Sequence, residues 1–186
     1  MKKISFTSDG NEVVTICDYH VKHWENGLVV FQPDEIWVAK SPLDSGNTEF
    51  IEANNLKHFY LKTGGGCIVT FPGNVEVAHF STNCNNDFST VVTDKVEKCL
   101  IDKGLNVTKD NNDVLVDGYK VFSVGTVNYN QRIKVTVIHV SINCDAELVN
   151  KICLKPMHKK PIGLSEYGIT SNEILELIMN EYNNGE

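Results

Sequence analysis

The sequence of 186 residues lacks any apolar run long enough to cross a membrane. Its opening Met1-Lys2-Lys3 leads into serine, threonine, aspartate and glycine instead of the apolar core of a secretory signal. Positive charge is also scarce, since the formal net charge is -7. This charge argues against a general binder of nucleic acids or of anionic membranes. We therefore expect a cytoplasmic protein that binds neither nucleic acid nor membranes.

The sequence has no C-x-x-C pair, although it contains 6 cysteines. None of them has a spacing to histidine that is typical of a metal site, so we predict no metal centre. In a reducing compartment most of these cysteines are expected to pack as small apolar side chains. Internal repeats and low-complexity linkers are absent too. A chain of this length and composition is predicted to form a single domain over residues 1–186.

Apolar periodicity and turn residues predict alternating groups of helices and strands. Helices are expected over residues 11–25, 48–56, 86–103 and 145–154 and after the capping box at 170–173. Strands are expected over residues 28–31, 36–39, 58–61, 67–71, 75–80, 114–116, 119–127 and 133–142. Because strands and helices do not alternate strictly, we predict the α+β class, with a mixed, largely antiparallel sheet and helices packed on one face.

The most informative segment is the glycine triplet Gly64-Gly65-Gly66, which lies between two strand-like runs. Each glycine held in regular structure costs roughly 0.5–1 kcal/mol relative to alanine. Such a run is retained where the backbone passes close to another group, often a ligand. The alternative is an ordinary mobile hairpin loop.

Three segments in this order resemble the catalytic domain shared by lipoate–protein ligases, octanoyltransferases and biotin protein ligases. The first runs from Gly64 to Asn74 and resembles the glycine block of the ligases. The second, Gly118-Tyr119-Lys120-Val121-Phe122-Ser123-Val124-Gly125, resembles the lysine block in its octanoyltransferase form. The third runs from His139 to Asp145 and is followed by a ligase-like Leu154-Lys155-Pro156. The resemblance spans about residues 11–171, and it is closest to a minimal lipoate–protein ligase domain.

The resemblance implies an enzyme that attaches a lipoyl or octanoyl group to a lysine of a lipoyl carrier domain or of the H protein. A ligase-like enzyme would use ATP and Mg and form an acyl-adenylate. Lys120 would be the catalytic residue, placing its charge where negative charge develops. The alternative for Lys120 is a solvated strand lysine after a turn. The residues implied to bind substrate are Gly64, Gly65, Gly66, Cys67, Thr70, Gly73, Asn74, Ser123, Val124 and Gly125.

Several residues depart from the pattern of these families. The ligases carry an Arg-Arg pair where this chain has Tyr60 and Leu61, and a histidine where it has Thr70. The octanoyltransferases carry a nucleophilic cysteine where this chain has Met157, which cannot form a thioester. A degenerate member that binds an acyl ligand or a carrier without turnover is therefore an alternative to an active enzyme.

A third alternative is an ATP-independent acyltransferase or amidotransferase that uses a displaced cysteine nucleophile. Cys144, near the end of a strand, and Cys153, on a helix with its apolar side expected to face the core, are the two candidates. For both, structural packing is the competing interpretation. The chain ends after one further helix, so no C-terminal accessory domain of the ligase type is expected. A basic cluster is either a solvated helix end or a docking patch for an acidic carrier domain. It consists of Lys151, Lys155, His158, Lys159 and Lys160.

Overall fold

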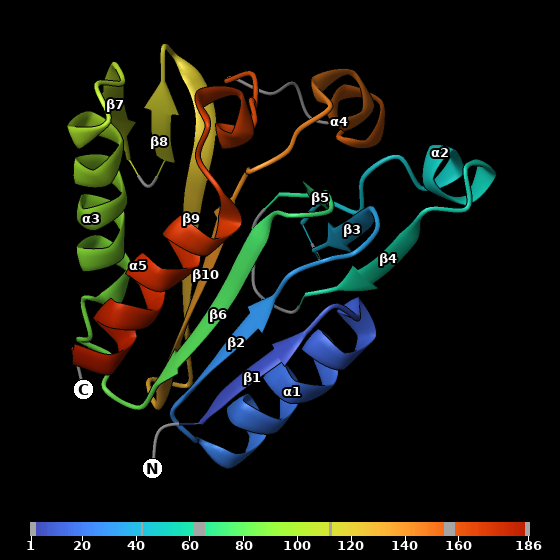
Figure 1. Cartoon of the computed structure of the whole chain (residues 1–186). Helices are drawn as coiled ribbons and strands as arrows, with labels where there is room; N and C mark the ends of the chain where they lie inside the picture. Colours follow the sequence, from blue (N-terminus) through green and yellow to red (C-terminus); the bar gives the residue numbers. More distant parts are fainter. Residues whose placement is uncertain (1–2, 42, 62–65, 112, 155–158, 185–186) are drawn as a thin grey trace.

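The computed structural model describes residues 3–41, 43–61, 66–111, 113–154 and 159–184. Within these residues the chain has the predicted α+β architecture, built on a large sheet of 7 strands (Figure 1). In pairing order the strands are β1 (Ile4–Thr7), β2 (Gly27–Phe31), β6 (Val75–Ser81), β10 (Ile133–Val140), β9 (Tyr119–Tyr129), β8 (Asp113–Val116) and β7 (Val107–Asp110). Only β1 and β2 pair in parallel, so the sheet is mixed and largely antiparallel as expected.

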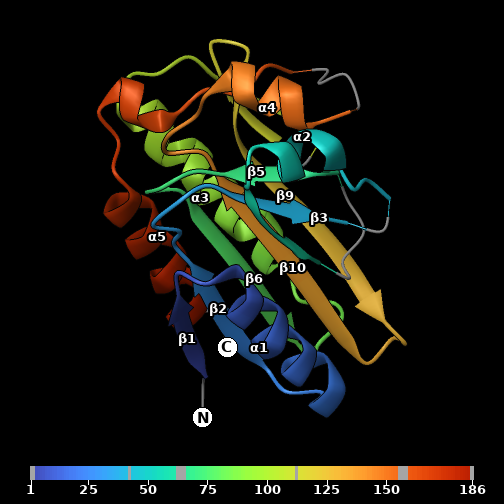
Figure 2. The same cartoon turned by 90° about the vertical axis from the view of Figure 1, so that its right-hand side faces the viewer.

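A second sheet of 3 strands lies against the large one. Its strands, in pairing order, are β4 (Lys57–Tyr60), β3 (Trp37–Lys40) and β5 (Ile68–Thr70). The parallel pair β3 and β4 needs a crossover connection, which contains the short helix α2 (Thr48–Ala53). Seen from the side in Figure 2, these short strands run across β6 and β10 of the large sheet. The two sheets therefore face each other over the middle of the molecule.

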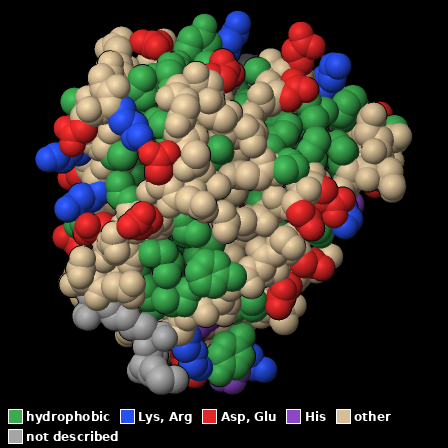
Figure 3. All heavy atoms as spheres, in the orientation of Figure 1, with side chains coloured by type: hydrophobic (Ala, Val, Ile, Leu, Met, Phe, Trp, Pro, Cys, Tyr) green, Lys and Arg blue, Asp and Glu red, His purple; other side chains and the backbone are tan. Residues whose placement is uncertain are grey.

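Two helices cover the other face of the large sheet, α3 (Phe88–Asp102) and α5 (Ser171–Asn184) (Figure 1). Their buried residues, among them Val92, Val96, Ile174 and Ile178, form the largest core together with alternate residues of β2, β6 and β10. On the outside, acidic and basic side chains are interleaved, as Figure 3 shows. The ion pairs of Lys109 with two carboxylates of α3 belong to this mixed surface.

The first helix, α1 (Gly10–His23), lies on the same face of the large sheet as the small sheet (Figure 2). We expected the helices to pack on one face of the sheet. This holds for α3 and α5, whereas α1 packs on the opposite face of the large sheet. A Cβ at Gly10 would lie 2.3 Å from the Phe59 ring, so only glycine permits this approach to β4. The helix ends at Trp24 in a left-handed conformation, and Gly27 is the first residue of β2.

The remaining helical segments close the upper end of the molecule in Figure 1. They are α4 (Ala146–Ile152), which packs beside α2, and the 3-10 turn η1 (Leu164–Tyr167). The expected capping box is confirmed, because Thr170 and Glu173 exchange hydrogen bonds at the start of α5. Two short edge strands, β1 and β7, were not predicted. No helix in the described residues is both apolar enough and long enough to cross a membrane.

Candidate functional site

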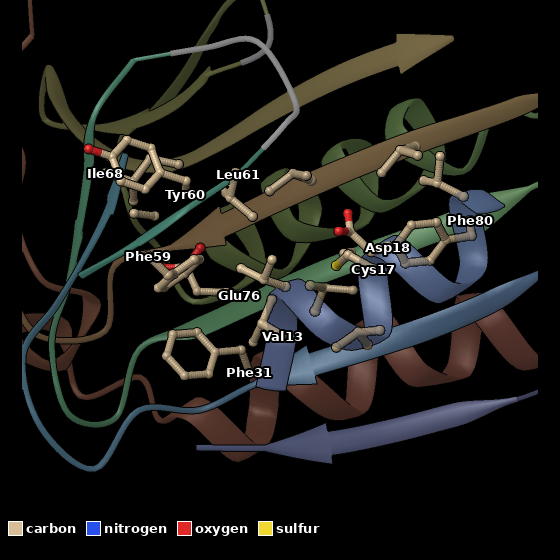
Figure 4. Close-up of a pocket in the computed structure, with 18 of the residues that line it drawn as sticks. Val13, Cys17, Asp18, Phe31, Phe59, Tyr60, Leu61, Ile68, Glu76 and Phe80 are labelled. Atoms are coloured by element: carbon tan, nitrogen blue, oxygen red, sulfur yellow. The ribbon is translucent and has the colours of Figure 1, made fainter. Parts of the chain in front are cut away.

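An apolar cavity of about 270 Å³ lies between α1, the small sheet and the large sheet. Figure 4 shows Val13 and Cys17 of α1 on one side, with Phe31, Phe59 and Phe80 around them. Burial raises the pKa of the Cys17 thiol to about 12, so this sulfur is a neutral part of the wall. We call this space the acyl chamber. Most of its lining is apolar, with Asp18, Lys22 and Glu76 as the charged exceptions, and such a space suits an apolar chain.

Two further cavities, of about 400 and 250 Å³, lie beside the acyl chamber. Both are lined by the same seven residues, Gly66, Cys67, Ile68, Asp113, Lys120, Ser123 and His139. Since they share so many residues, we treat them as one space and call it the polar cavity. It shares Ala39, Leu61, Ile68 and Val137 with the acyl chamber. An apolar space therefore adjoins a polar one that holds charged side chains.

Lys120 is positioned on the polar cavity by the hairpin of β8 and β9. The Asp117-Gly118 turn has positive φ at both residues, 52° and 82°, which gives the strands a tight connection. Across this hairpin Lys120 Nζ lies 2.9 Å from Asp113 Oδ1, and the lysine side chain is 33% exposed. The other oxygen of Asp113 accepts from Lys159 at 3.0 Å. Asp113 therefore holds the ammonium of Lys120 in place at the cavity wall.

A polar row crosses the large sheet at the floor of the polar cavity. The antiparallel register places His139 of β10 opposite Glu76 of β6 on one side and opposite Ser123 of β9 on the other. His139 Nδ1 lies 2.5 Å from Glu76 Oε1, and its Nε2 lies 3.0 Å from Ser141 Oγ. The side chains of Glu76 and His139 are each only 12% exposed, so these polar groups are paired away from bulk water.

A buried cation also lines the polar cavity. Lys40, the last residue of β3, is 1% exposed, and its Nζ lies 5.5 Å from the centre of the Tyr60 ring. Among the described residues, no carboxylate is within ion-pairing distance of this ammonium. A buried charge without a counter-charge is expensive, which makes Lys40 a natural contact for an anionic ligand.

The structure brings together many of the residues that the sequence singled out. Gly66, Cys67 and Ser123 line the polar cavity beside Lys120, and so do Val124 and Gly125 of β9. Gly64 and Gly65 lie outside the described residues. Because a lysine side chain is long and flexible, we expect the Lys120 ammonium to lie within about 10 Å of the Gly65 backbone. The proximity of Gly66 to Lys120 keeps that expectation in place as a prediction.

Three of the expected substrate-binding residues stand apart from Lys120. Thr70 lines the acyl chamber instead, and its buried Oγ1 has no hydrogen-bond partner among the described residues. Asn74 is fully buried, and its Oδ1 accepts from the backbone N–H groups of Ile142 and Asn143 at 2.9 and 2.8 Å. Gly73, at φ 86°, makes the turn before it. Gly73 and Asn74 line neither the acyl chamber nor the polar cavity, and their contacts give them a structural role.

Both candidate cysteine nucleophiles line the polar cavity together with Cys67. Cys153 was expected to face the core, and it does pack against the buried cluster that contains Val149 and Ile152. It follows Ile152, the last residue of α4, and also lines the polar cavity. Its Sγ lies 3.6 Å from the carbonyl oxygen of Cys67. A hydrogen bond between the two thiols lowers the pKa of Cys153 and raises that of Cys67. Burial raises the pKa of Cys144 to about 11, so this thiol is protonated at neutral pH.

The sequence reasoning did not identify Asp113, Lys40 or the role of His139 as parts of the site. Asp113 could have been found by extending the predicted hairpin outward from Asp117-Gly118, since a hairpin register pairs residues on either side of its turn. His139 belongs to a segment that the resemblance included, but its partner on β6 is 63 residues away. Lys40 follows an apolar run, and no local signal indicates that its side chain is buried. Among the described residues, no group of three or more histidine, cysteine or acidic side chains is arranged to hold a metal ion.

Solved structures with the same fold include lipoate–protein ligases. LipL1 from P. falciparum, in complex with lipoate, is 14% identical and has a TM-score of 0.79, covering 99% of this chain and 61% of that one. A bipartite lipoate protein ligase from Thermoplasma acidophilum, described with its E2 lipoyl domain, is 10% identical with a TM-score of 0.73 over 99% of this chain and 82% of that one. Lipoate-protein ligase A bound with ATP is 11% identical with a TM-score of 0.75, covering 99% and 84%.

This chain spans less than two thirds of LipL1, the first of these structures. Biotin protein ligases superpose less closely, with TM-scores of 0.52 and 0.53. No family model and no curated protein sequence matches the chain. At these identities the comparisons establish architecture only. The fold of this chain is that of the catalytic domain shared by lipoate–protein ligases and biotin protein ligases.

Proposed function

We propose that this chain binds lipoic or octanoic acid and attaches the acyl group to a lysine of a carrier domain. The observation that carries the proposal is the junction of an apolar chamber with a cavity that holds Lys40 and Lys120. A fatty acid has the same division, with a long apolar chain and one anionic end. The acyl chain would occupy the chamber, and the carboxylate would lie toward the two ammonium groups.

Lys120 is the residue proposed to act on the reacting carbonyl. An ammonium at the cavity wall stabilises negative charge that develops on an acyl oxygen, and such stabilisation is typically worth 10²–10³ in rate for one donor. Its ion pair with Asp113 fixes where that charge lies. Gly66, without a side chain, leaves the opposite wall open to the backbone of a ligand.

Adenylation of the acid by ATP is the finer part of the proposal. ATP, when bound with Mg, would supply a leaving group to the acyl carbon. Mg commonly uses one or two protein carboxylates together with phosphate oxygens. Two carboxylates line the larger part of the polar cavity, Asp44 and Asp113, and Asp113 is already paired with Lys120 and Lys159. Tyr60 and Leu61 replace the arginines of the ligases, so the phosphate charge would be met by lysines as point charges without a bidentate fork.

A lipoyl carrier domain is the proposed partner, and the H protein carries the same kind of lysine. One of the structures with this fold is described together with its E2 lipoyl domain. Lys151 and Lys160 are exposed, and each lies within two residues of a residue that lines the polar cavity, Cys153 or Lys159. They would offer basic docking contacts to an acidic carrier. Lys155 and His158, which belong to the predicted basic cluster, lie outside the described residues.

The second candidate function is binding of an acyl ligand or carrier without turnover. It is favoured by the ion pair that already neutralises Lys120 and by the missing arginines. The deciding experiment incubates the protein with octanoic or lipoic acid, ATP and Mg, and looks for acyl-adenylate and for an acylated lipoyl domain by mass spectrometry. Octanoate binding is measured separately by calorimetry.

For an active enzyme we expect Lys120→Ala to lower acyl transfer at least about 10²-fold. Its thermal stability should remain close to that of the wild type, within about 0.5 kcal/mol, as for a surface substitution. Lys98→Met, on the exposed side of α3, serves as the charge control. Binding of octanoate without adenylate or transfer would leave only the second function, and absence of binding would refute both.

A further inference from the structure

The polar row at the floor of the polar cavity has the arrangement of a serine nucleophile with its base. Ser141 Oγ lies 3.0 Å from His139 Nε2, and Glu76 Oε1 lies 2.5 Å from the other ring nitrogen. A nucleophilic hydroxyl requires a base within about 2.6–3.2 Å and a third group that orients the base. All three side chains meet this requirement without the movement of any strand.

The hydrogen-bonding capacity of the three groups determines where the proton lies. A carboxylate can only accept, so the His139 tautomer that fits a Glu76 carboxylate has its proton on Nδ1, which donates to Oε1. Nε2 is then left with a lone pair that accepts the hydroxyl proton of Ser141. This is the tautomer in which a histidine serves as a general base toward serine.

The backbone holds this group rigidly. Glu76 and His139 are directly opposite each other in the pairing of β6 and β10. The backbone N–H of Ser141 donates to Val121 O at 2.9 Å, and its carbonyl accepts from Leu164 N at 2.9 Å. Ser141 is thereby fixed on both sides, which keeps the Oγ–Nε2 distance short.

The surroundings fit an acyl-transfer reaction. His139 and Ser141 line the larger part of the polar cavity together with Lys120, while Glu76 reaches the acyl chamber on the other side of His139. A carbonyl beside Ser141 would have the Lys120 ammonium in the same cavity to stabilise an oxyanion. Glu76 touches no reacting atom in this arrangement and acts as a positioning residue for His139.

We propose that Ser141 is a nucleophile activated by His139 and Glu76, and that the site transfers acyl groups from thioesters or activated esters through an acyl-serine. This rests on the proposed acyl binding but requires no ATP. Ser141 Oγ bonds to the acyl carbon while its proton moves to His139 Nε2. The bond from that carbon to sulfur or oxygen breaks, and the leaving group takes the proton from His139. A lysine amine or water then attacks the acyl carbon, passing a proton to His139 and from there to the departing Ser141 oxygen.

The test uses p-nitrophenyl octanoate and an octanoyl thioester with the full chain, in the absence of ATP. We expect release of p-nitrophenol or thiol, and a mass increase of one octanoyl group on the peptide that contains Ser141. Ser141→Ala should lower the rate at least about 10³-fold. Ser141→Cys should restore acylation, since it places a thiol at the same position. Ser89→Ala, on α3 behind the large sheet, is the matched control and should react like the wild type.

The test of Glu76 must distinguish a loss of correct positioning of His139 from a loss of folding. Glu76→Gln should lower kcat by about 10²–10⁴-fold with little change in KM, because the amide favours the wrong histidine tautomer. Glu76→Asp should recover part of the lost kcat. Thermal unfolding of each variant confirms that it is folded.

Three results would overturn the inference. They are a Ser141→Ala protein that is folded and still reacts, an octanoyl group found only on Cys144 or Cys153, and a wild type that binds octanoate but reacts with neither ester nor thioester. Octanoate binding measured in parallel separates this failure from failure of the proposed function. A wild type that does not bind octanoate refutes that function, whereas binding without acyl-serine refutes only this inference.

Discussion

The histidine on the other face of β6, His79, makes the stability of this fold sensitive to mild acid. It is 1% exposed and packs between Phe88 of α3 and Tyr182 of α5, with ring-centre distances of 4.1 and 5.7 Å. Burial, with a smaller contribution from the nearby Lys134, lowers its pKa to about 4. An unfolded histidine has a pKa of about 6.5. Between these two values the unfolded chain binds a proton that the folded chain excludes.

The sign and size of the effect follow from this difference. Because the unfolded state binds more protons, the free energy of unfolding falls as the pH drops from about 6.5 toward 4. One pKa unit corresponds to 1.36 kcal/mol, so the contribution lost by pH 4 is about 3 kcal/mol, and by pH 5 about 2 kcal/mol. A domain has only about 5–15 kcal/mol of total stability, so this loss is readily measurable.

The assay is urea unfolding followed by circular dichroism at several pH values between 4 and 7.5. We compare the wild type with His79→Gln, which cannot titrate, and with His58→Gln, an exposed histidine on β4. His79→Gln lowers stability at pH 7 through lost packing, but its curve should be flatter by about 2 kcal/mol between pH 7 and 5. Parallel curves for the wild type and His79→Gln would refute the reasoning, because His79 would then have the same pKa in both states.

Two other predictions concern the cavities. Lys40→Met removes a buried charge, so the free energy of unfolding of this variant should equal or exceed that of the wild type. Calorimetry should show that its affinity for octanoate falls about tenfold, whereas its affinity for octanol is unchanged. An equal loss of affinity for octanoate and for octanol would contradict a role of the Lys40 charge in binding the carboxylate. Cys144→Ser and Cys153→Ser should each change acyl transfer by less than about threefold, under 1 kcal/mol on the barrier. A larger loss, with a stable acyl adduct on either cysteine, would restore the thioester route.

Local sequence signals determined most of the elements and the position of Lys120. The Asp117-Gly118 turn predicts the hairpin of β8 and β9, and Thr170 with Glu173 predicts the start of α5. Both signals act over two to four residues, so they can be read without knowing the rest of the fold. The order of the glycine block, the lysine block and the segment from His139 to Asp145 also indicated the fold. The edge strands β1 and β7 are short, and their pairing is decided by neighbours and not by their own pattern.

The composition of the site was decided by the tertiary structure. Period-two alternation shows which side of a strand is buried but not which strand lies beside it. The register of β10 with β6 is what places His139 beside Glu76, and no local pattern encodes that pairing. The small sheet covering the large one is what buries Lys40 and separates Thr70 from Lys120. The polar cavity is thus formed by segments that are distant in the sequence. The order of the motifs could suggest such a site, but only the packing of the two sheets defines which residues line it.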